Sequence, residues 1–287
     1  MVAGCGWLGT AAAKALVARG DRVTAVVRTL PHAVRLIEEG VPCLARDLAV
    51  PGASAGLPDH ADAVLCTQAA ADGGVAAYRR AYLDATRELL AYAARAGVSR
   101  LVATGSTGVF GQSGGVTVDE TTSPAPADPT AAVLVEAERL VLSAAGPGLA
   151  SCVVRASGLY GPGRTGVIER VRSGALALGP GDGAIMNFCH RDDAVAILLA
   201  ALDRGSPGAV YHASDLEPRT RAEVVAWIAK RLKMTPPRQD PGSGTALGRP
   251  RADRRISSAR TLAELGVRLA YPSFRKGMAR ETVELRT

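Results

Sequence analysis

The chain is 287 residues long, and its hydrophobic (47%) and charged (21%) fractions are those of an ordinary globular protein. Its net charge of +7 comes from arginines scattered along the sequence, so we expect a solvated surface and no nucleic-acid partner. No apolar run reaches the roughly 18 residues of a membrane span, and no secretion signal opens the chain. Five widely spaced cysteines without a Cys-x-x-Cys pair predict buried, reduced thiols in a cytoplasmic protein and no metal site.

Runs of β-branched and apolar residues alternate with helical patterns over the first half of the chain. We expect strands at 1–3, 22–27, 41–45, 63–67, 100–104 and 150–156. Helices are expected between them at 10–19, 32–39, 75–96 and 130–145, with Gly20 and Gly97 as stop signals. This alternation predicts right-handed βαβ crossovers and a parallel sheet that is covered by helices on both faces.

The second half of the chain is less regular. The segment 111–129 is rich in Gly, Ser, Thr, Pro and Asp, which predicts a long loop over one edge of the sheet. Further on we expect a strand at 209–213 and helices at 166–173, 192–203, 221–233 and 257–265. We therefore expect two interleaved units: a main domain at 1–158 to which 189–213 returns, and a small lobe built from 159–188 and 214–287.

The N-terminus reads Gly4-Cys-Gly6-Trp7-Leu8-Gly9, directly after a strand and at the start of a helix. Such a turn binds a dinucleotide, because its first glycine makes the tight turn and its second lets pyrophosphate approach the backbone. The third lets helix and strand pack closely, and the helix N-terminus faces the anion. We therefore predict that residues 4 and 6–9 bind the cofactor.

The end of the second strand distinguishes the two pyridine cofactors. A site for NAD places a carboxylate there to bind the ribose 2′-hydroxyl. This chain has Arg28 at that point and no carboxylate before Glu38. A guanidinium pairs with a 2′-phosphate, which a carboxylate would repel, so we predict NADP(H).

The segment Thr104-Gly-Ser106-Thr-Gly-Val-Phe-Gly111 follows the fifth strand, and Asp47-Leu48 follows the third. Together with the glycine turn, they resemble the extended short-chain dehydrogenase/reductase family over nearly the whole chain. The resemblance implies an α/β, Rossmann-like doubly wound parallel sheet with a small C-terminal substrate lobe. It also implies that Asp47 and Leu48 hold the adenine and that Ser106 polarises the substrate oxygen. Asp47 is equally suited to cap a local turn.

The family does its proton chemistry with a Tyr-x-x-x-Lys pair, and this chain has no lysine four residues after any tyrosine. If Glu138 is aligned with the glutamate that follows this pair, Thr130 stands at the tyrosine position and Leu134 at the lysine position. The tyrosine normally transfers the proton, and the lysine lowers the pKa of the tyrosine. Thr130 next to Leu134 does not ionise near neutral pH, so another group must act or no hydride is transferred.

Our first substitute is Tyr160, whose segment resembles the family's passage from the nicotinamide into the substrate lobe. Ser157 in that segment is predicted to contact the cofactor, and Arg164 to contact an anionic part of the substrate. The alternative for Tyr160 is simple packing beneath the loop.

Asn187-Phe-Cys-His190-Arg-Asp-Asp193 resembles another family element. We interpret its two aspartates as caps at a helix start and not as metal ligands, and Asn187 as a substrate contact. Nucleotide-sugar relatives often have a phosphate-binding arginine near Arg255, which makes Arg255 a further substrate-binding candidate.

Three functions remain open at this point. The first is an NADP(H)-dependent oxidoreductase or epimerase-like enzyme that acts on a small carbonyl or sugar-like substrate. The second is a non-redox isomerase or cyclase on the same scaffold, and the third is a non-enzymatic NADP-sensing module. The resemblance further implies a homodimer through the helices at 75–96 and 130–145.

Overall fold

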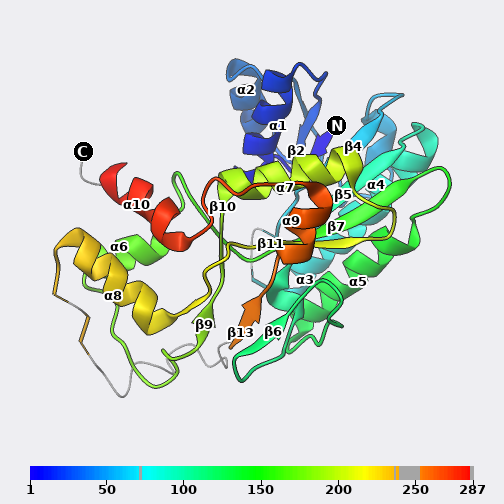
Figure 1. Cartoon of the computed structure of the whole chain (residues 1–287). Coiled ribbons are helices and arrows are strands. Elements are labelled where there is room, and N and C mark those ends of the chain that lie inside the picture. Colours follow the sequence, from blue (N-terminus) through cyan, green and yellow to red (C-terminus); the bar gives the residue numbers. More distant parts are fainter. Residues whose placement is uncertain (71–72, 236, 239–252, 285–287) are drawn as a thin grey trace.

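The computed structural model describes residues 1–70, 73–235, 237–238 and 253–284 (Figure 1). Its centre is one seven-stranded sheet in the order β11-β7-β5-β4-β1-β2-β3, in which every neighbouring pair is parallel. The strands are β1 (Val2–Ala3), β2 (Ala25–Val27), β3 (Cys43–Ala45), β4 (Ala63–Cys66), β5 (Arg100–Ser106), β7 (Ala150–Ala156) and β11 (Val210–Ala213). The order reverses between β1 and β4, where a doubly wound sheet opens its binding crevice. The predicted fold class is confirmed.

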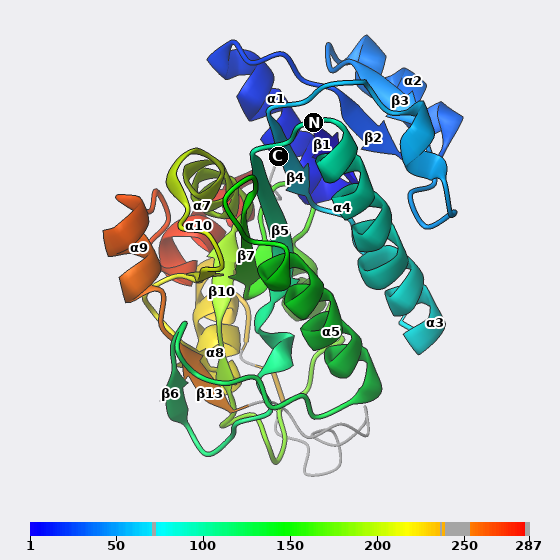
Figure 2. The same ribbon diagram turned by 90° about the vertical axis from the view of Figure 1, so that its right-hand side faces the viewer.

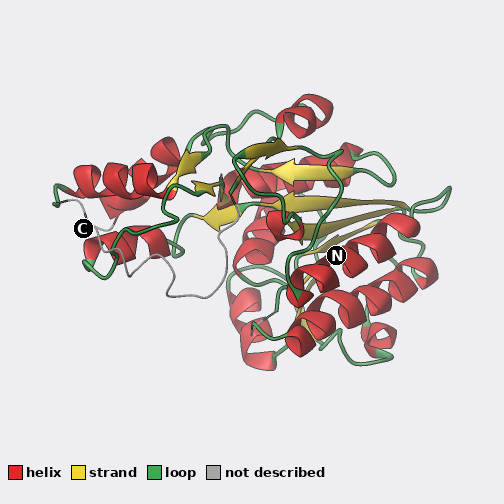
Figure 3. Ribbon diagram, turned by 90° about the horizontal axis from the view of Figure 1, so that it is seen from below, coloured by secondary structure: helices red, strands yellow, loops and turns green. Residues whose placement is uncertain are grey.

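Helices cover both faces of this sheet (Figures 2 and 3). One face packs against α1 (Trp7–Arg19), α2 (Leu30–Glu38) and α7 (Arg191–Arg204), and the other against α4 (Ala85–Arg95) and α5 (Pro129–Ser143). Side chains that alternate along each strand enter opposite cores, as the two-residue period of a strand requires. The strands are apolar on both sides for this reason.

The long helix predicted at 75–96 is not uniform. It begins as α3 (Val75–Tyr78), continues as a π-helical turn over Arg79–Asp84, and ends as α4. A π-helical turn fits one extra residue into the helix and often occurs at functional sites. It changes which side chains face the sheet on either side of the turn.

Among the described residues, three two-stranded sheets lie outside the central sheet, and the sequence did not predict them. They pair β8 (Gly158–Tyr160) with β10 (Phe188–His190), β9 (Ile185–Met186) with β12 (Arg219–Thr220), and β6 (Val116–Val118) with β13 (Arg254–Ile256). The expectation of an unbroken loop at 111–129 was therefore wrong. The partner of β6 is far away in the sequence, so no local pattern indicates the pairing.

A smaller hydrophobic core lies among α6 (Gly166–Arg172), α8 (Arg221–Leu232) and α10 (Phe274–Glu284), which Figure 1 shows beside the central sheet. Tyr160 and Phe188 also belong to this core. The sequence did not predict α10. Another helix, α9 (Ala259–Leu265), packs on α7 in the main core. The domain boundaries given above stay a prediction, and part of the expected lobe, 239–252, lies outside the described residues.

The five cysteine thiols are free, and all but Cys43 are buried. Burial raises the pKa of Cys5, Cys66 and Cys152 to about 12, so these thiols are unreactive near neutral pH. None of the helices in the described parts of the chain combines the length and the apolarity that a bilayer crossing requires.

Candidate functional site

The glycine turn has the geometry that its motif predicts. Gly4 has a φ of +82°, and a Cβ atom there would lie 2.3 Å from the Cα of Gln68. A Cβ on Gly9 would lie 2.3 Å from the Thr67 hydroxyl oxygen. Gly6 differs, because its nearest neighbour would be 4.0 Å away, so the N-terminus of α1 opens onto free space. This arrangement leaves room for an anion at the helix start.

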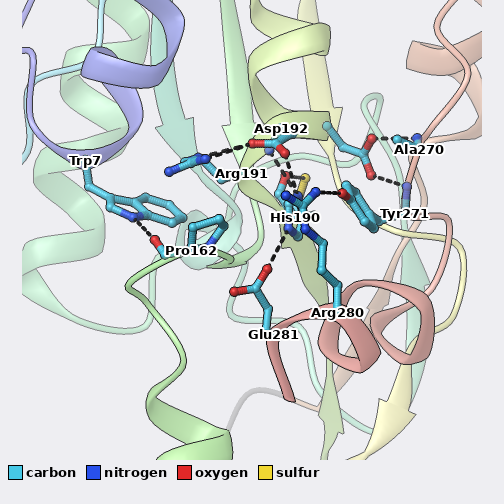
Figure 4. Close-up of polar contacts among 11 residues, drawn as sticks. Trp7, Pro162, His190, Arg191, Asp192, Ala270, Tyr271, Arg280 and Glu281 are labelled. Atoms are coloured by element: carbon cyan, nitrogen blue, oxygen red, sulfur yellow. Dashed lines mark hydrogen bonds and ion pairs between the residues drawn. The ribbon is translucent and has the colours of Figure 1, made fainter. Parts of the chain in front are cut away.

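Trp7 extends from this helix start toward the smaller lobe (Figure 4). Its indole N–H donates to the carbonyl oxygen of Pro162 at 2.8 Å. The guanidinium carbons of Arg164 and Arg191 lie 5.4 and 5.5 Å from the centre of the indole ring, which is cation–π range. Arg164 therefore stands close to the predicted pyrophosphate site, although we predicted it as a substrate contact. Leu8, in contrast, is buried in the main core.

The ends of β2 and β3 lie on the side of the sheet where we predicted the adenine to bind. Arg28 is exposed and forms no ion pair with any described residue. Asp47 accepts from the backbone N–H of Ala49 at 3.0 Å and pairs with Arg80 at 2.9 Å, while Leu48 is buried beside it. The local turn that was the alternative for Asp47 is present. Arg28 is thus an exposed cation at this edge that no described carboxylate neutralises, and Arg46 directly after β3 is a second one.

Ser106 ends β5, as predicted. Its half-buried hydroxyl oxygen accepts from the N–H of Gly108 at 3.0 Å, which leaves its own O–H free to donate to a ligand. Thr130 lies in the first turn of α5, and its hydroxyl donates to Asp128, the N-cap of that helix. The Thr130 hydroxyl is therefore already engaged in capping.

Ser157 follows β7 and is buried. Its hydroxyl lies 3.2 Å from the carbonyl oxygen of Ala213 and 3.1 Å from the hydroxyl of Ser214. These contacts join the ends of β7 and β11. The predicted contact of Ser157 with the cofactor stays a prediction.

Tyr160 packs in the smaller core and does not face the crevice. Its ring makes edge contacts with Phe188 and His190, at 5.8 and 5.3 Å between ring centres. Its hydroxyl is buried against Gly277 of α10 without a hydrogen-bond partner. Burial raises the pKa of this phenol far above its usual range. This placement corresponds to the packing alternative, in which Tyr160 is not a proton donor to a substrate.

The side chain of Asn187 binds the backbone of β13. Its amide nitrogen donates to the carbonyl oxygen of Arg254 at 2.9 Å, and its amide oxygen accepts from the N–H of Ile256 at 2.8 Å. Both ends of the amide are thus used to hold β13. Arg255 is exposed and donates to the carbonyl oxygen of Gly115, so it too binds a neighbouring strand segment.

The neighbouring Arg254 is the functional candidate that the sequence did not reveal. Its side chain is only 6% exposed, and one guanidinium nitrogen donates to the carbonyl oxygen of Thr107 at 2.7 Å, directly after Ser106. The other two nitrogens, Nε and Nη1, have no partner, and no described carboxylate pairs with this cation. Desolvation lowers the pKa of Arg254. Buried charges normally pair, so this unpaired guanidinium is a candidate contact for an anion.

His190 organises the junction between the two cores (Figure 4). It is the N-cap of α7, because its Nδ1 accepts from the N–H of Asp192 at 3.2 Å. We expected the aspartates to be the caps, and that was wrong: Asp193 instead accepts from the N–H groups of Ala270 and Tyr271 at 2.7 and 2.9 Å. The ring nitrogen Nε2 of His190 lies 3.4 Å from a carboxylate oxygen of α10. The segment 187–193 therefore has a structural role, because its side chains connect the start of α7 to α10 and to residues 270–271.

Asp215 is a buried carboxyl near this junction, and its Oδ2 has no partner. Burial raises its pKa from 3.8 to about 7, although the N–H of Phe274 opposes this. Between about pH 4 and about pH 7, the Asp215 carboxyl is therefore protonated in the native state and ionised in the unfolded chain. The free energy of unfolding falls as the pH rises through this window, by at most about 1.4 kcal/mol per pH unit.

We expect Asp215→Asn to become progressively more stable relative to the wild type as the pH rises from about 4 to about 7. The amide imitates the protonated carboxyl and cannot ionise. Urea unfolding across this range measures the difference. Asp59→Asn, at a fully exposed carboxyl, is the control for the loss of one acidic side chain. A flat difference for Asp215→Asn would show that its carboxyl does not titrate in this window.

A buried ion pair lies beneath the carboxyl end of β5. Both Nε and Nη2 of Arg155 on β7 donate to the carboxylate of Glu138 on α5, over 2.8–3.1 Å. The two side chains are 4% and 5% exposed. Desolvation raises the pKa of Glu138, while Arg155 acts against that rise. The guanidinium also lies 5.0 Å from the ring centre of Phe110. This pair connects α5 to the sheet next to Gly105 of β5.

Comparison with known proteins identifies one family and several related reductases. Residues 1–214 match the model of the NAD dependent epimerase/dehydratase family. A 3-diazoavenalumate denitrifying reductase from a Streptomyces species is 31% identical, with 98% of this chain and 99% of the relative covered. The 2-alkyl-3-oxoalkanoate reductase of Stenotrophomonas maltophilia is also 31% identical, over 88% of this chain and 77% of its own. MoeE5, solved with UDP-glucose and NAD, shares the fold, with a TM-score of 0.80, 24% identity and coverage of 100% and 99%.

Proposed function

The chain belongs to the NAD dependent epimerase/dehydratase family, and on that premise we propose that it is an NADP(H)-dependent reductase of a small carbonyl compound. The observation that carries the choice of cofactor is Arg28. It is an exposed guanidinium at the end of β2, where an NAD site would place a carboxylate. A 2′-phosphate would gain a charge-assisted hydrogen bond there.

The glycine turn fits a dinucleotide, since Gly6 leaves open space in front of α1. The bound cofactor would supply the hydride, and this chain's residues would hold and orient both reactants. Trp7, Arg164 and Arg191 would stand beside the pyrophosphate. The Arg164 cation favours a diphosphate there, whereas Arg191 also pairs with Asp192 at 3.2 Å. The reductase names of two relatives support a reduction over an epimerisation.

The substrate would lie beyond Ser106, whose free O–H is placed to hydrogen-bond a carbonyl oxygen. Arg254 next to it favours a substrate with a carboxylate or phosphate group, because such a group would neutralise a buried cation. We therefore propose an anionic carbonyl compound, with an oxo acid or a phosphorylated sugar as the two chemical forms.

Calorimetric titration of the purified protein with NADP⁺ and NAD⁺ tests the cofactor. We expect tighter binding of NADP⁺, and heat with neither coenzyme would overturn the proposal. The loss of NADPH absorbance with a series of short 3-oxo acids and their uncharged esters then tests the substrate. Faster consumption with the acids than with the esters is the expected result.

A second candidate is a non-redox isomerase on the same scaffold. It is favoured by the absence of a Tyr-x-x-x-Lys pair together with the burial of Tyr160. Its signature would be product formation while NADPH absorbance stays constant, whereas stoichiometric NADPH consumption would exclude it.

We expect Arg254→Met to leave the free energy of unfolding unchanged or to raise it in the absence of ligand. An unsatisfied buried donor costs about 1–3 kcal/mol, and methionine of similar length has none. Urea unfolding measures the change, and Arg255→Met on the exposed side of β13 is the control. A loss above about 2 kcal/mol for Arg254→Met alone would show that the cation holds the fold and is not prepared for a ligand.

A further inference from the structure

The crevice of a doubly wound sheet divides the cofactor between its two halves. The adenine half lies over β1 to β3, and the nicotinamide half lies over the carboxyl ends of β4 and β5. The residues at the family's tyrosine and lysine positions are Thr130 and Leu134. The first is engaged in capping α5, and the second is apolar. The nicotinamide half therefore needs another polar group.

A small cavity lies just under this half of the crevice, between the ends of β4 and β5 and the helices α4 and α5. Its volume is about 20 Å³, which suffices for one water molecule. Leu134 forms part of its wall. The polar residues of the wall are Gln68, Tyr82, Thr86, Thr104 and Glu138. The Thr104 hydroxyl and the Gln68 amide oxygen are buried without partners, so a water here would have hydrogen bonds to make.

Tyr82 differs from the other polar residues of this wall. It is a half-buried phenol, whereas Glu138 is already bound to Arg155. It comes from the π-helical turn Arg79–Asp84, whose extra residue directs this ring toward Leu134 and the end of β5. Its ring rests on Tyr78, with 5.4 Å between the ring centres. Packing against Tyr78, one helical turn earlier, thus restricts the rotamer of Tyr82.

The Tyr82 hydroxyl also reaches the loop that follows β4. The backbone of Ala70 acts on this phenol as a hydrogen-bond donor, although burial dominates and raises the pKa of Tyr82. The phenol therefore stays protonated near neutral pH and is able both to donate and to accept. Gln68 in the same loop abuts the glycine turn at Gly4. Tyr82 thus lines the same small cavity as Gln68, the residue that borders the glycine turn.

We propose that the Tyr82 phenol binds the nicotinamide ribose of the cofactor and so replaces the missing Tyr/Lys pair at this position. The inference rests on the proposed function, because it requires a dinucleotide in the crevice. In relatives the Tyr/Lys pair lies on the helix that corresponds to α5. Here the contact would come from the π-helical turn Arg79–Asp84, which positions the Tyr82 ring.

Tyr82→Phe tests this proposal without a known substrate. NADP⁺ and adenosine 2′,5′-bisphosphate, which lacks the nicotinamide ribose, are titrated by calorimetry into the wild type and the variant. We expect about a tenfold weaker affinity for NADP⁺, since one hydrogen bond is lost, and an unchanged affinity for the bisphosphate. Tyr78→Phe, which removes a hydroxyl from the neighbouring ring, is the matched control and should change neither affinity.

The other outcomes are equally informative. Equal NADP⁺ affinities of Tyr82→Phe and the wild type would overturn the inference while the proposed function stands. Equal losses on NADP⁺ and on the bisphosphate would overturn it too, because Tyr82 would then only support the fold. A wild-type protein that binds neither compound would overturn the proposed function itself. Thermal unfolding of both variants verifies that each retains its fold.

Discussion

Glu138→Ala is expected to lower the free energy of unfolding by about 3–5 kcal/mol. The variant leaves the Arg155 guanidinium buried with no carboxylate to neutralise it, at a place where the pair is only 4% and 5% exposed. Because this loss is a large share of a typical domain's stability, the variant is expected to melt far below the wild type. Urea unfolding, followed by circular dichroism, measures the change.

The chain offers a matched control two residues away on the same helix. Glu136 is half exposed and pairs with Arg79 and Arg87 at 3.5 and 3.6 Å, so Glu136→Ala should cost at most about 1 kcal/mol. The double variant Glu138→Leu/Arg155→Met removes both charges and should recover much of the loss. Equal costs for the Glu138 and Glu136 variants would contradict the burial of the pair.

Arg28→Ala is expected to weaken NADP⁺ binding about 10- to 100-fold and to leave NAD⁺ binding nearly unchanged. The loss of affinity should be selective for NADP⁺, because the two coenzymes differ only in the 2′-phosphate that the Arg28 guanidinium would bind. Parallel calorimetric titrations with both coenzymes give the ratio of affinities directly.

Arg22→Ala is the control for this experiment, because Arg22 precedes the same strand at its opposite end and is also exposed. The two variants lose the same charge, so a general effect of net charge would weaken NADP⁺ binding in both. Such a result, or an unchanged coenzyme ratio in Arg28→Ala, would remove Arg28 from the site.

The parts of the site that depend on local sequence could be predicted. The glycine turn is complete within six residues, and its steric roles follow from the backbone alone, so Gly4 and Gly9 have the close contacts that the motif requires. Ser106 likewise follows from the position of one strand end. The alternation of βαβ units was sufficient to predict a parallel sheet that is covered by helices on both faces.

The parts that depend on distant segments could not be predicted. Two adjacent arginines on one strand point to opposite sides, and only the pairing of β13 with β6 shows that Arg254, not Arg255, is buried beside Thr107. Tyr160 is similar, because the helix that covers its hydroxyl lies more than a hundred residues later in the chain.

The hydrogen bond from Trp7 to Pro162 has a consequence for the order in which ligands act. It joins the first turn of α1, which would bind the coenzyme, to the segment that leads into α6 of the smaller lobe. A ligand that settles at one end of this link therefore restrains the other. By thermodynamic reciprocity, an occupied coenzyme cradle would strengthen substrate capture by the same factor as substrate strengthens retention of the coenzyme.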